Sequence, residues 1–270
     1  MRKTKNKDTH LKAEGSIYEV QSNKEFKKNN LLNWHSNTDF WLQSKMRHLR
    51  DVWDFTGTQI QELIGLCDNR ENPYLMDFGC GEGWILRLIL EKKIRVNYIG
   101  LDFNENFILF LQETYKDYRN AQFECVDFEE EPRSNLVSKA DIGINFFNFF
   151  EIPDIKTAFG NVAKMLKPDS YLMIANIDPV MQILSVSKSE GDFRTNLKLY
   201  EKYGSRLGYD KDIDIGDFKS NRVYKSLLYS TDTYVQLAKQ NKMQLIDYKE
   251  VVKTGNIVPQ IYQFIFFHKL

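Results

Sequence analysis

Short apolar runs alternate with amphipathic stretches between residues 71 and 177. The apolar runs have the length and composition of buried strands, and they cover residues 74–78, 96–103, 121–128, 140–147 and 171–177. The amphipathic stretches between them predict helices over residues 83–92, 104–117 and 154–166, and Pro168 prevents the last of these from continuing. This alternation predicts a parallel sheet covered by helices, which we take as the core of the protein.

The pattern of strand and helix returns in residues 231–270. A capped helix is expected in "STDTYVQLAKQNK", followed by strands in "QLIDYKEVV" and "QIYQFIFFHK" with a turn near residues 255–256. Two strands joined by so short a connection are most simply an antiparallel hairpin. The fold class expected is therefore α/β, with a seven-stranded, mostly parallel sheet and a terminal antiparallel hairpin.

Three segments lie outside this regular pattern. Residues 1–30 are rich in lysine and show no sustained apolar period, so we expect a basic, flexible tail. Residues 31–70 have helical spacing and predict an N-terminal helical cap. Residues 178–230 contain no clear strand and are too long for an ordinary connection, which suggests a substrate lid inserted after the fifth strand. An ordinary helical decoration is the competing interpretation. The tyrosines that favour a lid are Tyr200, Tyr203, Tyr209, Tyr224 and Tyr229.

Composition narrows the classes of partner. The 37 basic and 37 acidic residues give a formal net charge of zero, so no global attraction to nucleic acid or to anionic lipid is expected. Cys67, Cys80 and Cys125 are not spaced as CxxC pairs, which argues against a disulfide framework or a zinc site, and no metal is expected. The chain shows neither a signal peptide nor an apolar segment long enough to span a membrane, so a cytoplasmic location is expected.

The first strand of the core runs into a glycine-rich loop, "YLMDFGCGEGWILR", in which Gly79, Gly81 and Gly83 alternate with other residues. Open α/β sheets bind ligands beyond the carboxyl ends of their strands, where this loop lies. A phosphate-binding P-loop would need a GK pair followed by Ser or Thr, and none is present. A GxGxxG dinucleotide fingerprint would need a glycine where Trp84 stands. The spacing instead suits a nucleoside-like ligand without phosphates.

Acidic residues follow the next two strands at regular intervals. Asp102 lies 19 residues after Gly83, and Asp127 lies 25 residues after Asp102. A carboxylate at the end of the second strand can accept hydrogen bonds from both hydroxyls of a ribose. Alone, each aspartate is explained as well by a helix cap or a turn, but together with the glycines they favour a nucleoside site.

The loop resembles motif I of the class I methyltransferases that depend on S-adenosylmethionine (SAM). The resemblance covers residues 70–180 well and residues 231–270 as the terminal hairpin, and it implies a Rossmann-like fold with SAM as cofactor. It implies that Asp102 holds the ribose, that Asp127 faces the adenine amino group, and that the end of the fourth strand borders the sulfonium. The residues it assigns to cofactor binding are Asp77, Gly79, Cys80, Gly81, Gly83, Asp102, Phe103, Asp127, Phe128, Asn145 and Phe146.

The resemblance predicts the methyl donor better than the acceptor. We expect transfer to an oxygen or nitrogen atom of a small molecule in specialised metabolite biosynthesis, with His35 and Glu151 as candidate catalytic bases. A packed or half-exposed histidine near a helix start is the competing interpretation of His35. Arg47 and Arg50 are candidates for binding the methionine carboxylate of SAM.

Two other functions remain open at this point. The first is methylation of RNA or protein, although amino-directed nucleic-acid enzymes of this family carry (D/N/S)PP(Y/F) after the fourth strand. This chain has "NFFN" at residues 145–148, without prolines. The second is a non-catalytic SAM-binding subunit, because cofactor binding and turnover need different residues.

Overall fold

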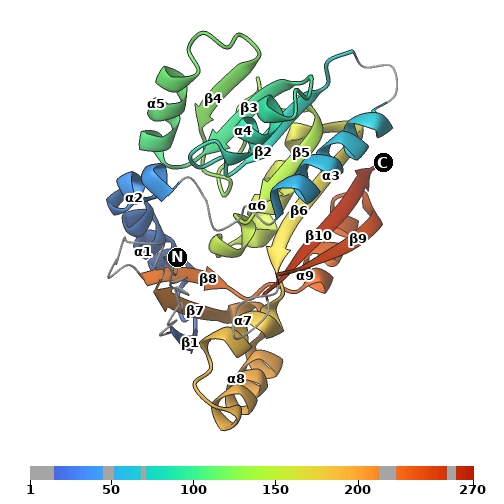
Figure 1. The fold of residues 1–270 in the computed structure, drawn as a ribbon. Helices are drawn as coiled ribbons and strands as arrows, with labels where there is room; N and C mark the ends of the chain where they lie inside the picture. The colour runs from blue at the N-terminus through green and yellow to red at the C-terminus, as the bar shows by residue number, and fades with distance from the viewer. Residues whose placement is uncertain (1–14, 45–51, 68–70, 213–222, 254–259) are drawn as a thin grey trace, which may run out of the picture.

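A seven-stranded sheet forms the centre of the computed structural model, which describes residues 15–44, 52–67, 71–212, 223–253 and 260–270 (Figure 1). The order of the strands across the sheet is β4-β3-β2-β5-β6-β10-β9. The strands are β2 (Tyr74–Phe78), β3 (Asn97–Asp102), β4 (Ala121–Cys125), β5 (Ala140–Phe146), β6 (Leu166–Ile177), β9 (Met243–Lys253) and β10 (Gln260–Lys269).

Strand direction follows the predicted scheme. The strands from β4 to β6 run parallel, whereas β10 is antiparallel to both β6 and β9. The central strand β2 pairs with β3 on one side and with β5 on the other. The chain adds β3 and β4 on the first side and then crosses to β5 on the second, so the switch point of the strand order lies between β2 and β5. Ligands of open α/β sheets bind at such a switch point. The predicted fold class, including the terminal antiparallel pair, is confirmed; the predicted turn at residues 255–256 lies outside the described residues.

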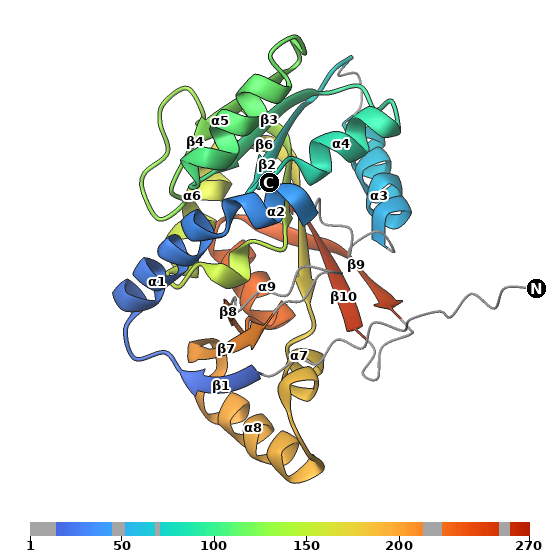
Figure 2. The ribbon, with the colours of Figure 1, turned by 60° about the vertical axis from the view of Figure 1, so that its left-hand side comes forward.

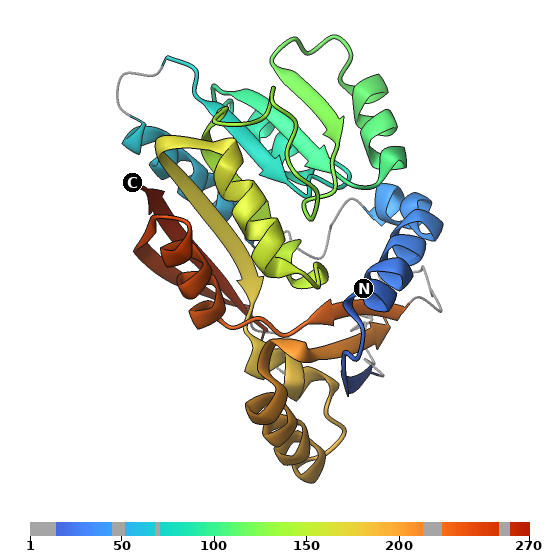
Figure 3. The same ribbon diagram turned by 180° about the vertical axis from the view of Figure 1, so that it is seen from behind.

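Helices cover both faces of the large sheet (Figures 1 and 3). The buried cluster on one face contains residues of α3 (Trp53–Leu66), α4 (Trp84–Glu91) and α5 (Glu105–Thr114), and that on the other contains residues of α6 (Ile155–Met165) and α9 (Thr231–Gln240). The strands between these layers are buried on both sides, which explains why β5 reads as a continuous apolar run.

The N-terminal segment is more ordered than its composition predicts. Strand β1 (Gly15–Glu19) and the first half of helix α1 (Asn23–Ser36) lie within residues 1–30, so the expectation of a flexible tail is wrong for residues 15–30. The side chain of Ser22 caps α1 by accepting from the N–H of Glu25. Helix α2 (Thr38–Ser44) follows, and Figure 2 shows α1 and α2 lying along one edge of the large sheet.

The insertion after β6 also contains strands that the sequence did not reveal. Helices α7 (Pro179–Val186) and α8 (Glu190–Tyr203) and the single turn η3 (Gly204–Arg206) lead into β7 (Leu207–Asp212) and β8 (Val223–Leu227). These strands join β1 in a separate antiparallel sheet of order β1-β7-β8, seen at the bottom of Figure 1. The expectation of no strand in residues 178–230 is therefore wrong. The pattern failed because β7 is polar and depends on pairing with β1, nearly 200 residues earlier.

Element boundaries differ from the prediction mainly at two strands. Strand β6 begins at Leu166 rather than at residue 171 and includes Pro168, next to a register irregularity in its pairing with β5. Strand β4 ends at Cys125, so Asp127 lies in the loop beyond it. Among the described residues, no helix is both long and apolar enough to cross a membrane.

Candidate functional site

The glycine loop takes a backbone path that side chains would obstruct. Gly79, Gly81 and Gly83 have φ values of +85°, +50° and +83°, in the left-handed region that favours glycine. A Cβ on Gly79 would lie 2.4 Å from Cγ of Asn148, and one on Gly83 would lie 2.7 Å from Cδ2 of Leu111. A Cβ on Gly81 would meet nothing within 4 Å. Two of the glycines therefore allow close packing, whereas the middle one borders open space.

Asp102 joins this loop to the end of β3. Its Oδ2 accepts from the N–H of Gly81 at 2.9 Å, and its Oδ1 accepts from the N–H of Asn104 at the same distance. The residue is buried, and burial raises the pKa of its carboxyl to about 6, although the backbone hydrogen bonds act in the opposite direction. The carboxylate is thus fixed in orientation at the position where the sequence predicts ribose binding.

Asp77 lies at the base of the same site. It is buried at the end of β2 and accepts a hydrogen bond on Oδ2 from the hydroxyl of Tyr98 at 2.6 Å. Its Oδ1 is buried and has no hydrogen-bond partner within the described part of the chain. Burial raises the pKa of Asp77 to about 7, with the Asp102 and Glu82 carboxylates adding to the effect. A buried acceptor of this kind is matched by a ligand that brings a donor or a positive charge.

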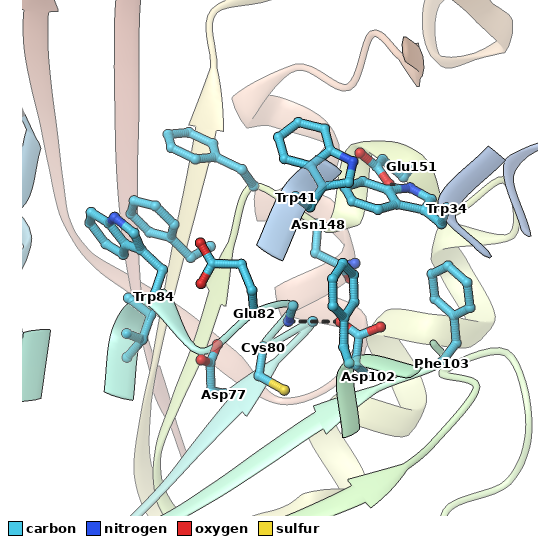
Figure 4. Close-up of a pocket in the computed structure, with 16 residues that line it drawn as sticks. Trp34, Trp41, Asp77, Cys80, Glu82, Trp84, Asp102, Phe103, Asn148 and Glu151 are labelled. Carbon is cyan, nitrogen blue, oxygen red and sulfur yellow. Dashed lines mark hydrogen bonds between the residues drawn. The ribbon is translucent and has the colours of Figure 1, made fainter. Parts of the chain in front are cut away.

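A pocket opens at the carboxyl ends of β2, β3 and β5, between the glycine loop and helices α1 and α2 (Figure 4). Aromatic rings and carboxylates dominate its lining, and Figure 4 shows Trp34, Trp41 and Glu151 on the side opposite Asp77 and Asp102. Its lining residues are Trp34, Trp41, Asp77, Gly79, Cys80, Gly81, Glu82, Trp84, Ile85, Asp102, Phe103, Phe107, Phe146, Phe147, Asn148 and Glu151.

A second pocket continues from the first beyond β4, since both are lined by Trp34, Phe103, Asn148 and Glu151. It adds residues of helix α1 and of the loop after β4, among them Asn30, Asp127 and Phe128. Lys27 forms ion pairs there with Asp127, at 2.6 Å, and with Glu129. Burial opposes the charge on Lys27, but the two carboxylates outweigh it and raise the pKa of the lysine.

Helix α1 is fastened to the segment that leaves β5. The indole N–H of Trp34 donates to the Glu151 carboxylate, and Nδ2 of Asn30 donates to the Glu151 carbonyl oxygen at 3.1 Å. Trp34 also stacks on Trp41 of α2, with ring centroids 5.1 Å apart. Glu151 belongs to the single turn η2 (Phe149–Glu151). The first two helices therefore cover the pocket opening above the sheet edge.

The structure brings most of the cofactor residues expected from the sequence to these two pockets. Asp77, Gly79, Cys80, Gly81, Asp102, Phe103 and Phe146 line the first, and Asp127 and Phe128 line the second. Gly83 instead sits at the N-terminus of α4. Burial raises the pKa of the Cys80 thiol well above its usual range, which keeps it protonated and fits a small filler in the loop.

Asn145 takes a structural position rather than lining either pocket. It is buried, its Nδ2 donates to the Phe78 carbonyl at 3.1 Å, and its Oδ1 accepts from the N–H of Phe149 at 3.0 Å. Its amide therefore holds the exit of β5 in place.

The two candidate bases differ in position. Glu151 lines both pockets. His35 is exposed in the last turn of α1, three residues before α2 begins, and it stacks on Phe103 with centroids 6.0 Å apart without lining either pocket. Arg47 and Arg50 lie outside the described residues.

Sequence reasoning missed several lining residues, notably Trp34, Trp41, Glu82 and Asn148. Glu82 is buried within the glycine loop and forms a bidentate ion pair with Arg87, whose second nitrogen lies 2.9 Å from Oε1. Its position between two motif glycines was a signal that it would lie near the ligand. Trp34 and Trp41 flank His35 in "LNWHSNTDFW", whose aromatic residues could shape a pocket, but they reach this site only through the placement of α1 and α2.

Comparison with known families gives a match to this core. Residues 76–172 match the family model described as "Methyltransferase domain". Over these residues the core is similar to methyltransferase domains. The match begins within β2 and ends within β6, and so it contains the glycine loop and both predicted acids of the site. Helices α1 and α2, which cover the pocket, precede the matched region.

Curated proteins described as methyltransferases are similar to part of this chain. A putative methyltransferase, 235L, of Invertebrate iridescent virus 6 is 31% identical over 121 residues, which are 45% of this chain and 43% of that protein. The malonyl-[acyl-carrier protein] O-methyltransferase of Acetivibrio thermocellus is 24% identical over 136 residues, 50% of this chain and 46% of that protein. The chain thus aligns with less than half the length of these curated relatives.

Among solved structures, the fold of this chain is similar to that of magnesium protoporphyrin IX methyltransferase from Synechocystis PCC 6803, which was determined with bound S-adenosylhomocysteine (SAH). The TM-score is 0.60 at 11% identity, and the match covers 91% of this chain and 100% of that one. At this identity the likeness establishes the fold alone.

Proposed function

We propose that this protein binds SAM and transfers its methyl group to an oxygen or nitrogen atom of a small-molecule acceptor. The observation that carries the proposal is the hydrogen bond from the N–H of Gly81 to Asp102. It fixes a carboxylate beside the glycine loop, at the switch point of the sheet. The methyltransferase relatives support the type of reaction. The acceptor class rests on the zero net charge and on the insertion, neither of which favours nucleic acid.

Three features of the site fit this cofactor. The space beside Gly81 accommodates a ligand that a Cβ would obstruct. The unpartnered Oδ1 of Asp77 suits the positive charge or N–H donors of a methionine moiety. The ribose hydroxyls can donate to Asp102, whose orientation is already set by two backbone N–H groups. The adenine ring would then lie in the second pocket, beside Phe103, Phe128 and Asp127.

SAM supplies a methyl group that is already electrophilic on a sulfonium, so the tasks left to the protein are alignment and exclusion of water. The rings of Trp34, Trp41, Trp84 and Phe146 line the first pocket and give it apolar walls. Phe146 stacks on Trp84 with centroids 4.4 Å apart, which fixes the wall at the end of β5. Glu151 provides a carboxylate that can take the proton released by a hydroxyl or ammonium acceptor.

The insertion is proposed to cover the acceptor side of the site as a lid. Its contact with the pocket segment is direct, because the hydroxyl of Tyr229 donates to the Ile152 carbonyl at 2.8 Å, one residue after Glu151. Its own small core joins α7, α8, β7 and the end of β8 and includes Tyr209 and Leu228. A lid with its own core and a fixed contact beside Glu151 can shape the acceptor space without belonging to the cofactor site.

The experiment that tests the proposal has two steps. Calorimetry with SAM and SAH first measures cofactor binding, and SAH release is then followed with fractionated small-metabolite pools, total RNA or unfolded protein as acceptor. The proposal expects SAH release with a small-molecule fraction only. Release with RNA or protein would replace the acceptor class, and binding without release from any pool would favour a non-catalytic subunit.

A further inference from the structure

The second pocket is lined by a buried amide oxygen, that of Asn30, which has no hydrogen-bond partner among the described residues. Asn30, on helix α1, is 5% exposed and lines this pocket. Its Nδ2 donates to the Glu151 carbonyl oxygen at 3.1 Å, whereas its Oδ1 is buried and receives no hydrogen bond from any residue that the structure describes. Buried amide oxygens are rarely left unsatisfied, so this one can accept a hydrogen bond from a ligand in the pocket.

The orientation of the Asn30 amide follows from its neighbour. Exchanging the oxygen and nitrogen atoms would place Oδ1 against the Glu151 carbonyl oxygen, two acceptors with no proton between them. The carbonyl therefore fixes Nδ2 on its own side and leaves Oδ1 as the acceptor. A ligand in this pocket consequently meets a hydrogen-bond acceptor contributed by α1.

The surroundings of Asn30 define the chemistry of that ligand. Phe103 and Phe128 line the same pocket and offer apolar surfaces to a flat ring. Asp127, the expected partner of the adenine amino group, already accepts from the N–H of Glu129 on Oδ1 and pairs with Lys27 on Oδ2. The Asn30 oxygen is thus a buried acceptor in this pocket for which the described residues supply no donor.

We propose that Asn30 accepts a hydrogen bond from the exocyclic amino group of the cofactor adenine. This inference rests on the proposed function, since it takes SAM as the ligand. An exocyclic amino group has two N–H donors, so a second acceptor can act beside Asp127. Helix α1, which precedes the matched methyltransferase domain, would then take part in cofactor recognition as well as covering the pocket.

The proposal makes Asn30 a discriminating residue. A purine with an oxygen in place of the amino group would set its own acceptor against the Asn30 oxygen and lose affinity. A residue that only anchored α1 to Glu151 would support the amino and the oxo ligand equally. The ratio of the affinities for the amino and the oxo ligand therefore distinguishes recognition of the purine by Asn30 from mere anchoring of α1. The affinity for one ligand alone does not distinguish them.

The test is calorimetry of SAH and of its 6-oxo analogue, S-inosylhomocysteine, with the wild-type protein, Asn30→Ala and the control Asn29→Ala. Asn29 lies on the same helix and is exposed. We expect Asn30→Ala to weaken SAH binding about tenfold while changing the affinity for the analogue by less than about threefold, and Asn29→Ala to change neither. Equal weakening of both ligands by Asn30→Ala would overturn the proposal and leave an anchoring role only.

A second variant keeps the test decisive if Asn30→Ala does not fold. Asn30→Asp retains an acceptor in the pocket but loses the donor to Glu151, so the preference for SAH over the analogue should persist in it. Loss of that preference in a folded Asn30→Asp protein contradicts the proposal. Failure of the proposed function would look different, because the wild-type protein would then bind neither ligand.

Discussion

The N–H of Gly81 donates to Oδ2 of Asp102 at 2.9 Å, so the loop after β2 and the acid at the end of β3 form one unit without a ligand. The other carboxylate oxygen of Asp102 accepts from the N–H of Asn104. A ligand that binds here meets a carboxylate whose direction is already set, and this preorganisation lowers the entropic cost of binding. The predictions below concern this unit and the elements that cover it.

Alanine substitutions at two glycines of the loop, Gly81 and Gly79, should have different effects on stability and on SAH binding. Gly81→Ala should lower the free energy of unfolding by only about 1 kcal/mol, the cost of a left-handed residue, because its Cβ meets no protein atom. SAH binding should nevertheless fall sharply, since the methyl group enters the cofactor space. Gly79→Ala should instead destabilise the fold by more, through its clash with Asn148. Urea unfolding and calorimetry measure the two effects, and normal SAH affinity in Gly81→Ala would contradict this placement of the cofactor.

Stability should decrease as pH rises through the weakly acidic range. Burial raises the pKa of Asp77 to about 7 and that of Asp102 to about 6, whereas an unfolded aspartate titrates near pH 3.9. The folded protein therefore binds more protons than the unfolded chain between about pH 4 and about pH 7, and the free energy of unfolding falls across this window. Asp77→Asn keeps an oxygen for the Tyr98 hydroxyl and should flatten the slope. Urea midpoints at about pH 5 and about pH 8 check this, and the same slope in variant and wild type would refute it.

Substitution of the two candidate bases, Glu151 and His35, should have different effects on kcat. Glu151→Gln retains an oxygen for the Trp34 indole but cannot take a proton, so kcat should fall by roughly a hundredfold or more while SAH affinity changes little. His35→Ala should leave kcat within about twofold, as expected for an exposed side chain outside both pockets. Steady-state kinetics with the acceptor found by the SAH-release assay measure both. A larger loss of kcat in the His35 variant than in the Glu151 variant would reverse the assignment.

The contact between the insertion and the segment after Glu151 should contribute to the free energy of unfolding. Tyr229 is buried and donates to the Ile152 carbonyl at 2.8 Å, so Tyr229→Phe leaves that acceptor unpaired and should cost about 1–2 kcal/mol. Tyr248→Phe is the control, because its hydroxyl bonds to Glu250 on an exposed strand and should contribute less than about 0.5 kcal/mol. Equal unfolding free energies for the two variants would show that the Tyr229 contact does not hold the insertion.

The sequence predicts those parts of the molecule whose signals are local. The spacing of Gly79, Gly81 and Gly83 and the position of Asp102 at a strand end depend on a few neighbouring residues, and the core built around them is confirmed. The helices that cover the site, α1 and α2, are held by contacts between residues far apart in the sequence. Trp34 and Glu151 are 117 residues apart, and their hydrogen bond has no counterpart in local patterning.

The small sheet and Asn145 illustrate the same limit in other ways. Strand β1 pairs with β7, with Ile17 opposite Tyr209. Because isolated strands of this kind are not stable, neither segment carries a strand signal in its own local sequence. Asn145 stands where the family pattern suggests a cofactor contact, yet its amide bonds to the backbone at Phe78 and Phe149. Strand position was predictable for this residue, whereas the direction of its side chain required the packed structure.

The central claim is that Asp102 and the glycine loop bind SAM, and calorimetry with SAH tests it most directly. Wild-type protein should bind SAH. Asp102→Ala should bind it about 10- to 100-fold more weakly, which corresponds to the loss of a charge-assisted hydrogen bond of about 1.5–3 kcal/mol. Asp117→Ala, an exposed aspartate outside the site, should bind as the wild type does. Absence of SAH binding by the wild-type protein, or unchanged affinity in Asp102→Ala, would contradict the account.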